Sequence, residues 1–185
     1  MTITVAITGA SGVQYGVRLL EALRDLQVET QLIVTKSGQD LMSIETQYSL
    51  NYVTSLAHQI YEEMDLSAPI ASGSHISNGM VIIPCSMKTL GSIAHGISSN
   101  LVTRAADVCL KERRKLILVV RETPLSGIHL SNMLKLSQCG AVIVPASPGF
   151  YTRPATIGEL IDTLVARVLD LLQLDHSLSQ RWGAE

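Results

Sequence analysis

The chain alternates short runs of consecutive apolar residues with longer stretches in which apolar positions recur every three or four residues. The short runs are rich in Val and Ile, which is typical of strands in a parallel sheet that is covered on both faces. The longer stretches have the period of amphipathic helices. The pattern predicts strands over Ile3–Ile7, Thr30–Val34, Met80–Pro84, Leu116–Val120 and Ala141–Pro145, and helices over Val13–Leu26, Gly38–Glu45, Leu101–Glu112, Ile128–Cys139 and Thr156–Leu172.

This alternation predicts an α/β fold: a three-layer, doubly wound parallel sheet of the flavodoxin-like or Rossmann-like kind. The 185 residues are enough for a single domain, 1–185, with a substantial core. The least regular stretch is Gln47–His75, where we expect a short helix near Val53–Met64 and then a loop. In such folds ligands gather at the carboxyl ends of the strands, so we expect the chemistry there.

Composition narrows the possible partners and compartments. Only 16% of the residues are charged, which predicts that part of the surface is covered in a homo-oligomer. A net charge of −2 and few aromatic residues argue against nucleic acid. No apolar run approaches the roughly 20 residues of a membrane span, and the N-terminus predicts a strand rather than a signal peptide. The cysteines form no disulfide or zinc pattern and the histidines no metal pattern, so we expect no metal and a cytoplasmic location.

A loop of small residues, Thr8–Gly12, stands between the first strand and the first helix. Free backbone N–H groups at a helix N-terminus favour a bound phosphate. The glycines at 9, 12 and 16 lack the dinucleotide spacing, and the second strand ends at Thr35 and Lys36 without an acidic residue. These features argue against NAD binding and leave NADP as a weak alternative. The hydroxyl groups of Thr35 and Ser37 suit FMN better. A glycine turn that serves only close strand–helix packing is the alternative.

Later strand ends carry further candidate chemistry. In the loop expected after the third predicted strand, Ser86 and Thr89 are placed to donate hydrogen bonds to a second part of the ligand, whereas Cys85 is expected to be a buried residue and not a nucleophile. Arg121 and Glu122 form either an ion pair that closes the sheet edge or an anion-binding arginine beside an acid/base glutamate.

The C-terminal third adds four more candidates. Tyr151 either donates its hydroxyl to a phosphate or packs its proline-rich loop. Arg167, amid apolar neighbours, either reaches out to solvent or binds an anion. His129 is the histidine best placed to line a site, and Trp182 either covers a pocket or anchors the tail.

Six ordered blocks of residues resemble the UbiX-type flavin prenyltransferases, and the resemblance spans nearly the whole chain, ending with Arg181-Trp182. The blocks are Ile7–Gly16, Pro84–Leu90, Arg104–Val108, Leu110–Arg114, Arg121–Pro124 and Pro148–Tyr151. The resemblance implies a flavodoxin-like fold that assembles into dodecamers. It also implies metal-free attachment of a dimethylallyl group to N5 and C6 of reduced FMN. The product of this reaction is the cofactor of UbiD-type decarboxylases.

The resemblance also implies a role for each matching residue. FMN would be held by Gly9, Ala10, Ser11, Thr35, Ser86, Met87, Lys88, Thr89 and Arg121. The donor, dimethylallyl monophosphate or the diphosphate, would be gripped by Lys111, Arg121, Tyr151 and Arg167. Catalytic roles would fall to Glu45, Glu122 and Ser11. Subunits can share a site, so these residues need not meet within one chain.

Two alternatives remain beside prenyl transfer. Flavin-dependent cysteine decarboxylases have the same fold and cofactor, but they resemble one another in a Pro-x-Met-Asn segment. Here the corresponding segment, Arg121–Leu125, has no Met-Asn. A non-catalytic FMN carrier or accessory subunit would need the flavin loops, but it would not need Lys111, Glu122, Tyr151 and Arg167 together. The missing Met-Asn pair and the joint presence of these four residues both favour prenyl transfer.

Overall fold

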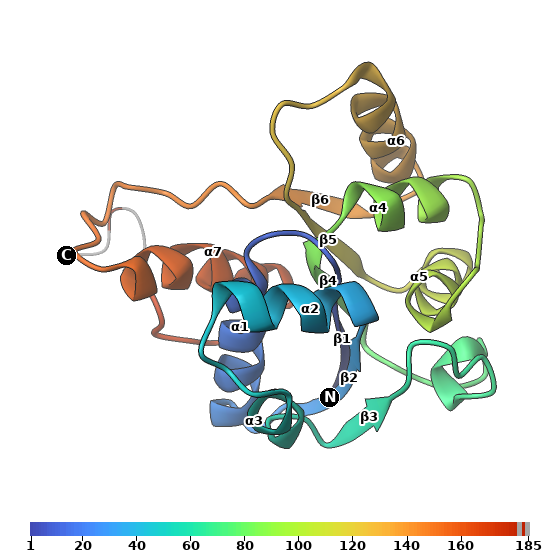
Figure 1. Cartoon of the computed structure of the whole chain (residues 1–185), viewed down its shortest axis with the longest axis horizontal. Coiled ribbons are helices and arrows are strands. Elements are labelled where there is room, and N and C mark those ends of the chain that lie inside the picture. The colour runs from blue at the N-terminus through green and yellow to red at the C-terminus, as the bar shows by residue number, and fades with distance from the viewer. Residues whose placement is uncertain (181–182, 184–185) are drawn as a thin grey trace.

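In the computed structural model, which describes residues 1–180 and 183, six parallel strands form one sheet in the order β3-β2-β1-β4-β5-β6 (Figure 1). The strands are β1 (Thr2–Ile7), β2 (Glu29–Val34), β3 (Gln59–Tyr61), β4 (Met80–Cys85), β5 (Leu116–Val120) and β6 (Val142–Pro145). The direction of winding reverses between β1 and β4, which are neighbours in the sheet. The predicted α/β class and doubly wound topology are confirmed, and the reversal marks the expected ligand-binding edge.

Helices cover both faces of the sheet. Figure 1 shows α1 (Val13–Asp25) and α7 (Ile157–Leu171) together on one side, and α4 (Met87–Ala94) and α5 (Leu101–Lys111) on the other. The layer that contains α1 and α7 also contains α2 (Lys36–Glu45) and α3 (Leu50–Ser55). The layer that contains α4 and α5 also contains the 3-10 turn η1 (Pro69–Ala71). The helix α6 (Gly127–Gln138) packs beside α4 and β6.

Each strand except the short edge strand β3 contributes to two hydrophobic cores, which explains its consecutive apolar residues. In β1, Ile3, Val5 and Ile7 point into the core under α1 and α7, whereas Ala6 points into the core under α4 and α5. All four are fully buried. Side chains of a strand alternate between the faces of the sheet, so a strand covered on both faces needs apolar residues at successive positions.

Two predicted segments differ from the structure. The helix expected near Val53–Met64 is wrong, because α3 ends at Ser55 and β3 follows it. This short strand adds to the open edge of β2 with Gln59 opposite Gln31. The segment after β4, interpreted as a loop, is the start of α4, and Ser86 caps it by accepting the Thr89 N–H at 3.3 Å.

Close packing explains one glycine near the first loop. A Cβ on Gly16 would lie 2.4 Å from the carbonyl oxygen of Ile83 and 2.8 Å from the Ile7 side chain. Glycine at this position therefore allows α1 to lie directly against β1 and β4.

Within residues 1–180 and 183, no helix has both the length and the apolar character needed to cross a membrane. The tail residues Arg181 and Trp182 lie outside the described residues, and the role suggested for Trp182 remains a prediction.

Candidate active site

Three helices begin at one cavity of about 270 Å³ on the carboxyl edge of the sheet, here named the first cavity. Its wall includes Thr35, Ser86 and Asn100, which are the N-cap residues of α2, α4 and α5. Each helix N-terminus presents unpaired backbone N–H groups and the positive end of the helix dipole. Three such N-termini converge at this cavity. Other hydroxyl groups of the wall belong to Thr8, Ser37, Thr89, Ser92, Ser99 and Thr103. This set suits a phosphate and a polyhydroxyl chain.

Thr8 joins the two loops that flank the switch point. Its buried hydroxyl donates to the carbonyl of Pro84 at 2.7 Å and accepts the backbone N–H of Ser86 at 2.9 Å. The small-residue loop after β1 and the start of α4 are therefore held as one unit. Gly9, Met87 and Lys88, all predicted to hold the ligand, line the first cavity beside it.

Glu63 is a residue of the first cavity that the sequence pattern does not indicate. One carboxylate oxygen accepts the backbone N–H of Lys36 at 2.7 Å, and the other accepts the side-chain amide of Asn100 at 2.8 Å. Glu63 therefore fixes the start of α2 relative to the start of α5. It lies in the irregular stretch after β3, where no periodicity or motif signals a role.

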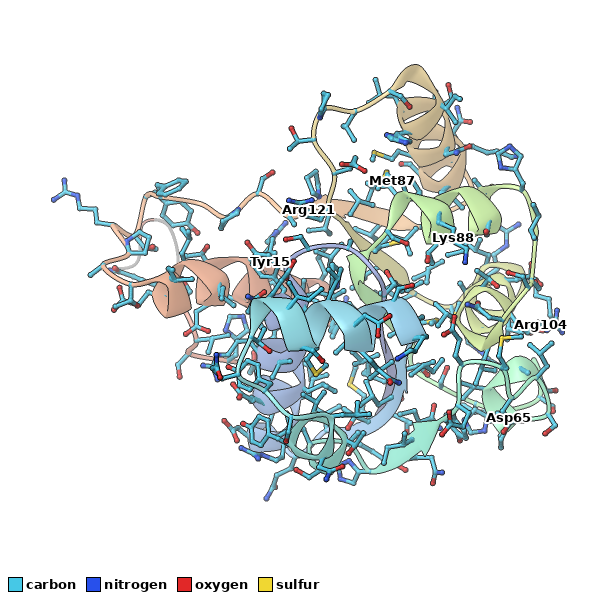
Figure 2. The ribbon with its side chains drawn as sticks, in the orientation of Figure 1. Tyr15, Asp65, Met87, Lys88, Arg104 and Arg121 are labelled. Atoms are coloured by element: carbon cyan, nitrogen blue, oxygen red, sulfur yellow. The ribbon has the colours of Figure 1, made fainter. Side chains whose placement is uncertain are left out.

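A second cavity of about 490 Å³ adjoins the first and contains Ser11, Glu45 and Arg121. Figure 2 shows Arg121 at the end of β5 and Tyr15 at the start of α1, and both line this cavity. Partial burial raises the pKa of the Tyr15 hydroxyl above its ordinary value of 10.0. Ile157 and Ile161 of α7 supply apolar wall.

Glu45 supports the first loop at the edge of the second cavity. Gly12 begins α1 with a left-handed backbone, at φ +100°, and has no side chain to cap the helix. Its backbone N–H donates instead to the Glu45 carboxylate at 2.8 Å. A negative charge at a helix N-terminus is favourable, so Glu45 does for α1 what a capping side chain does for other helices.

Arg121 and Glu122 point into different cavities. Arg121 lines the second cavity and Glu122 the first, and Glu122 accepts the Thr123 N–H at 2.9 Å. Both residues are described by the structure, and no ion pair joins them, so they do not close the sheet edge as an ion pair. Gly9 and Ser11 are divided between the two cavities in the same way. The cavities therefore meet at the loops after β1 and β5, and one extended ligand can occupy both.

A third cavity of about 610 Å³ lies between the loop after β6 and α7, and it contains Tyr151 and Arg167. It is next to the second cavity, because Ala146 lines the second and Ser147 the third. A Cβ on Gly149 would lie 2.9 Å from the Tyr151 ring, so the glycine lets the ring lie over the loop. The Arg167 side chain is 66% exposed and forms an ion pair with Asp170 at 3.6 Å.

Three candidates lie away from the cavities in this chain. Lys111 ends α5, about 15 Å along the helix from its start at the first cavity, and forms an ion pair with Glu112. The hydrogen bond that the Lys111 ammonium group donates to Glu112 lowers the pKa of the Glu112 carboxyl group. Ala10, in the middle of the first loop, is buried and lines none of the three cavities. His129 caps α6, where its Nδ1 accepts the Ser126 N–H at 3.2 Å.

Cys85 is unsuited to nucleophilic chemistry, as expected. It is fully buried at the end of β4, and desolvation raises the pKa of its thiol to about 12. A cysteine attacks as the thiolate, which is scarce at neutral pH when the pKa is so high.

Comparison with known proteins agrees with this geometry. Residues 1–169 match the family described as Flavoprotein. The chain is 48% identical over 183 residues to the flavin prenyltransferase UbiX of Methanocaldococcus jannaschii, with 99% of each chain covered. The crystal structure of AnUbiX (PadA1) in complex with FMN and dimethylallyl pyrophosphate matches with a TM-score of 0.98 and 47% identity, over 100% of this chain and 98% of that one. A dodecameric FMN-dependent UbiX-like decarboxylase from Escherichia coli O157:H7 matches with a TM-score of 0.97 and 48% identity over the whole of both chains.

An all-parallel sheet with a phosphate-suited cavity at its switch point is the architecture of α/β proteins that bind phosphate-bearing cofactors, and the family match makes this one a flavoprotein. The chain belongs to the Flavoprotein family and, within it, to the UbiX-type flavin prenyltransferases. The family predicted from the six sequence blocks is confirmed.

Proposed function

We propose that this protein transfers a dimethylallyl group from dimethylallyl monophosphate to N5 and C6 of reduced FMN. The observation that carries the proposal is the row of cavities along one edge of the sheet. Helix N-termini surround the first cavity, Arg167 and Tyr151 line the third, and the second lies between them. Two substrates that each carry a phosphate need two such anion sites, with their reacting parts in the space between.

FMN fits the first and second cavities. The phosphate and ribityl chain match the N-termini and hydroxyl groups around Thr35, Ser86 and Thr89, and Arg121 can reach the ligand from the second cavity. Gly9, Ser11, Met87 and Lys88 complete the binding segments, and Ala10 is the buried residue between Gly9 and Ser11. When bound, reduced FMN supplies the nucleophilic atoms, so the protein acts chiefly by positioning and polarising the reactants.

The donor phosphate is bound in the third cavity by Tyr151 and Arg167. An allylic phosphate leaves only when its developing charge is stabilised, which a hydroxyl group and cations can do. Two cations of the predicted donor set remain: Arg121, which lies in the adjoining second cavity, and Lys111. Since it lies far along α5 in its own chain, we assign the Lys111 of each site to a neighbouring copy.

A homo-oligomer agrees with the surface of the chain. Leu130 and Leu134, one turn apart on α6, and Ile128 at the start of the same helix are all more than half exposed, and exposed apolar side chains of this size favour contact with another copy. We propose a dodecamer, which is the assembly stated for the similar E. coli protein.

Acid/base roles fall to carboxylates at the boundary between the cavities. Glu122, in the first cavity, is the group proposed to accept the proton lost from C6 on ring closure. Glu45 and Ser11 face the second cavity, where the reacting parts meet. Glu45 also holds the Gly12 N–H, so it supports the flavin loop as well as the chemistry.

The test is to mix the protein anaerobically with reduced FMN and dimethylallyl monophosphate and to measure the flavin mass after denaturation. We expect the mass to rise by one dimethylallyl group, and the diphosphate arm shows which donor is used. An unchanged flavin mass would favour a carrier, and loss of carbon dioxide from a cysteine peptide would favour a cysteine decarboxylase. We further propose that the product serves a UbiD-type decarboxylase, which is tested by reconstituting an apo-decarboxylase with the released flavin.

A cytoplasmic location is part of the same proposal. Cys85, Cys109 and Cys139 are all free thiols, which suits a reducing compartment. Cell fractionation tests this directly.

A further inference from the structure

The segment after α7 folds back over the third cavity, and His176 makes the contact. The ring is almost wholly buried, with 4% of the side chain exposed. Its Nε2 lies 3.2 Å from Oδ1 of Asp170, and its Nδ1 lies 3.3 Å from the backbone nitrogen of Leu178. Both His176 and Asp170 line the cavity that contains Arg167.

These two contacts determine the protonation of the ring. The backbone N–H of Leu178 can only donate, so Nδ1 of His176 must accept. The proton of the neutral ring then resides on Nε2, from which it is donated to Asp170.

Asp170 connects the ring to Arg167. While Oδ1 accepts from His176, Oδ2 lies 3.6 Å from the Arg167 guanidinium. Arg167 is mostly exposed, so an unsupported side chain would lose much rotamer entropy when it binds an anion. A carboxylate held by a buried ring restricts the guanidinium before the anion arrives, which improves affinity.

We propose that His176 is a positioning residue, which orients Arg167 through Asp170 for the phosphate of the donor. This inference rests on the proposed function, in which Arg167 binds that phosphate. His176 touches neither substrate in this scheme, and its effect is on donor affinity rather than on the chemical step.

A matched pair of variants separates this role from simple anchoring of the tail. Glutamine reaches about as far as Nε2 and keeps a donor for Asp170, whereas asparagine reaches about as far as Nδ1 and keeps an acceptor for Leu178. We expect His176→Asn to weaken binding of dimethylallyl monophosphate to the oxidised-FMN protein roughly threefold to tenfold, the usual range for one lost hydrogen bond. KM for the donor should rise to the same extent with kcat and FMN affinity unchanged, and His176→Gln should restore wild-type values.

An Arg167→Ala background provides the control. If His176 acts through Arg167, His176→Asn should cause no further loss of donor affinity there. A full additional loss in this background, equal loss in both histidine variants, or no loss in either would overturn the proposal.

A measurement made without the donor distinguishes failure of this inference from failure of the proposed function. Nitrogen-15 NMR of histidine-labelled protein, assigned by difference from His176→Asn, should show the proton of His176 on Nε2. A proton on Nδ1 would overturn the positioning role. Failure of the wild-type protein to alkylate FMN would overturn the proposed function instead and would leave this NMR result unaffected.

Discussion

The buried hydroxyl of Thr8 accepts the backbone N–H of Ser86 at 2.9 Å, and this contact joins the first loop to the start of α4. The same hydroxyl donates to the Pro84 carbonyl at 2.7 Å. Two segments separated by more than seventy residues therefore form one edge of the first cavity.

Replacing this hydroxyl should weaken both the fold and the flavin site. We expect Thr8→Val, which keeps the shape, to lower the free energy of unfolding by about 1–3 kcal/mol, because the Ser86 N–H loses its acceptor. FMN affinity, measured by flavin fluorescence, should fall with it. Thr8→Ser keeps the hydroxyl and should behave nearly as wild type. Equal urea midpoints for Thr8→Val and wild type would contradict this role.

Two substitutions of Glu45 should distinguish its support of the first loop from its role in the reaction. Glu45→Ala removes the acceptor for Gly12 N–H, so we expect FMN binding to weaken about tenfold, within the range for a hydrogen bond to a charged group. Glu45→Gln keeps an acceptor oxygen but no charge, and should retain most FMN affinity while lowering kcat. Titration with oxidised FMN and anaerobic turnover measure the two effects. Full turnover in Glu45→Gln would confine the residue to a structural role.

A shared site predicts complementation between subunits. Lys111→Ala and Arg167→Ala should each abolish most donor-dependent turnover as pure assemblies. In assemblies co-expressed with equal amounts of both, about a quarter of the sites should combine an intact Arg167 with an intact Lys111 from a neighbour, if the copies mix at random. Turnover near that fraction of wild type is the expected result. If Lys111 served its own chain, every site would carry one defect and mixing would restore nothing.

Two buried thiols should make the protein less stable in alkali. Desolvation raises the pKa of Cys85 to about 12 and of Cys109 to about 11, from an ordinary 9.0. Above pH 9 the unfolded chain loses these protons while the folded chain keeps them. Stability is therefore fully present below pH 9 and falls as pH rises, by about 1.4 kcal/mol per pH unit for each thiol until its folded pKa is reached.

The measurement compares the pH dependence of unfolding in wild type and Cys85→Ala between pH 8 and pH 11. Cys85→Ala should be less stable at neutral pH but should show a shallower alkaline decline. Cys139 is exposed, so Cys139→Ser is the matched control and should decline as wild type does. Identical slopes for wild type and Cys85→Ala would refute the shift at Cys85.

The predicted strands and helices agree with the structure where a pattern depends on burial of whole faces. β5 is a continuous apolar run and β1 ends in one, Val5–Ile7, because both faces of the sheet are covered, and α1 and α7 show the period of helices with one buried face. Ser11, Glu45 and Arg121 were predicted from separate segments, and one cavity brings them together.

The strand β3 and the helix α4 are absent from the prediction for different reasons. β3 has three residues, too few for a period, and it forms through hydrogen bonds to the edge of β2. The start of α4 does have a local signal in the sequence, because Ser86 and Thr89 form a capping arrangement. The prediction of a loop treats these two residues as ligand donors instead. Nothing local distinguishes Glu63 from other surface glutamates, since its two partners belong to α2 and α5.

The sequence by itself determined the order of strands and helices, the small-residue loop after β1 and the family, because these depend on periodicity and on residues adjacent in the chain. Only the tertiary structure decided that the N-termini of α2, α4 and α5 meet at one cavity, that Arg121 and Glu122 face different cavities, and that α5 presents its start, and not its Lys111 end, to the first cavity. The physical reason is that these relations depend on strand order and on the length and direction of packed helices. Such quantities arise from contacts between distant segments, and no local pattern encodes them.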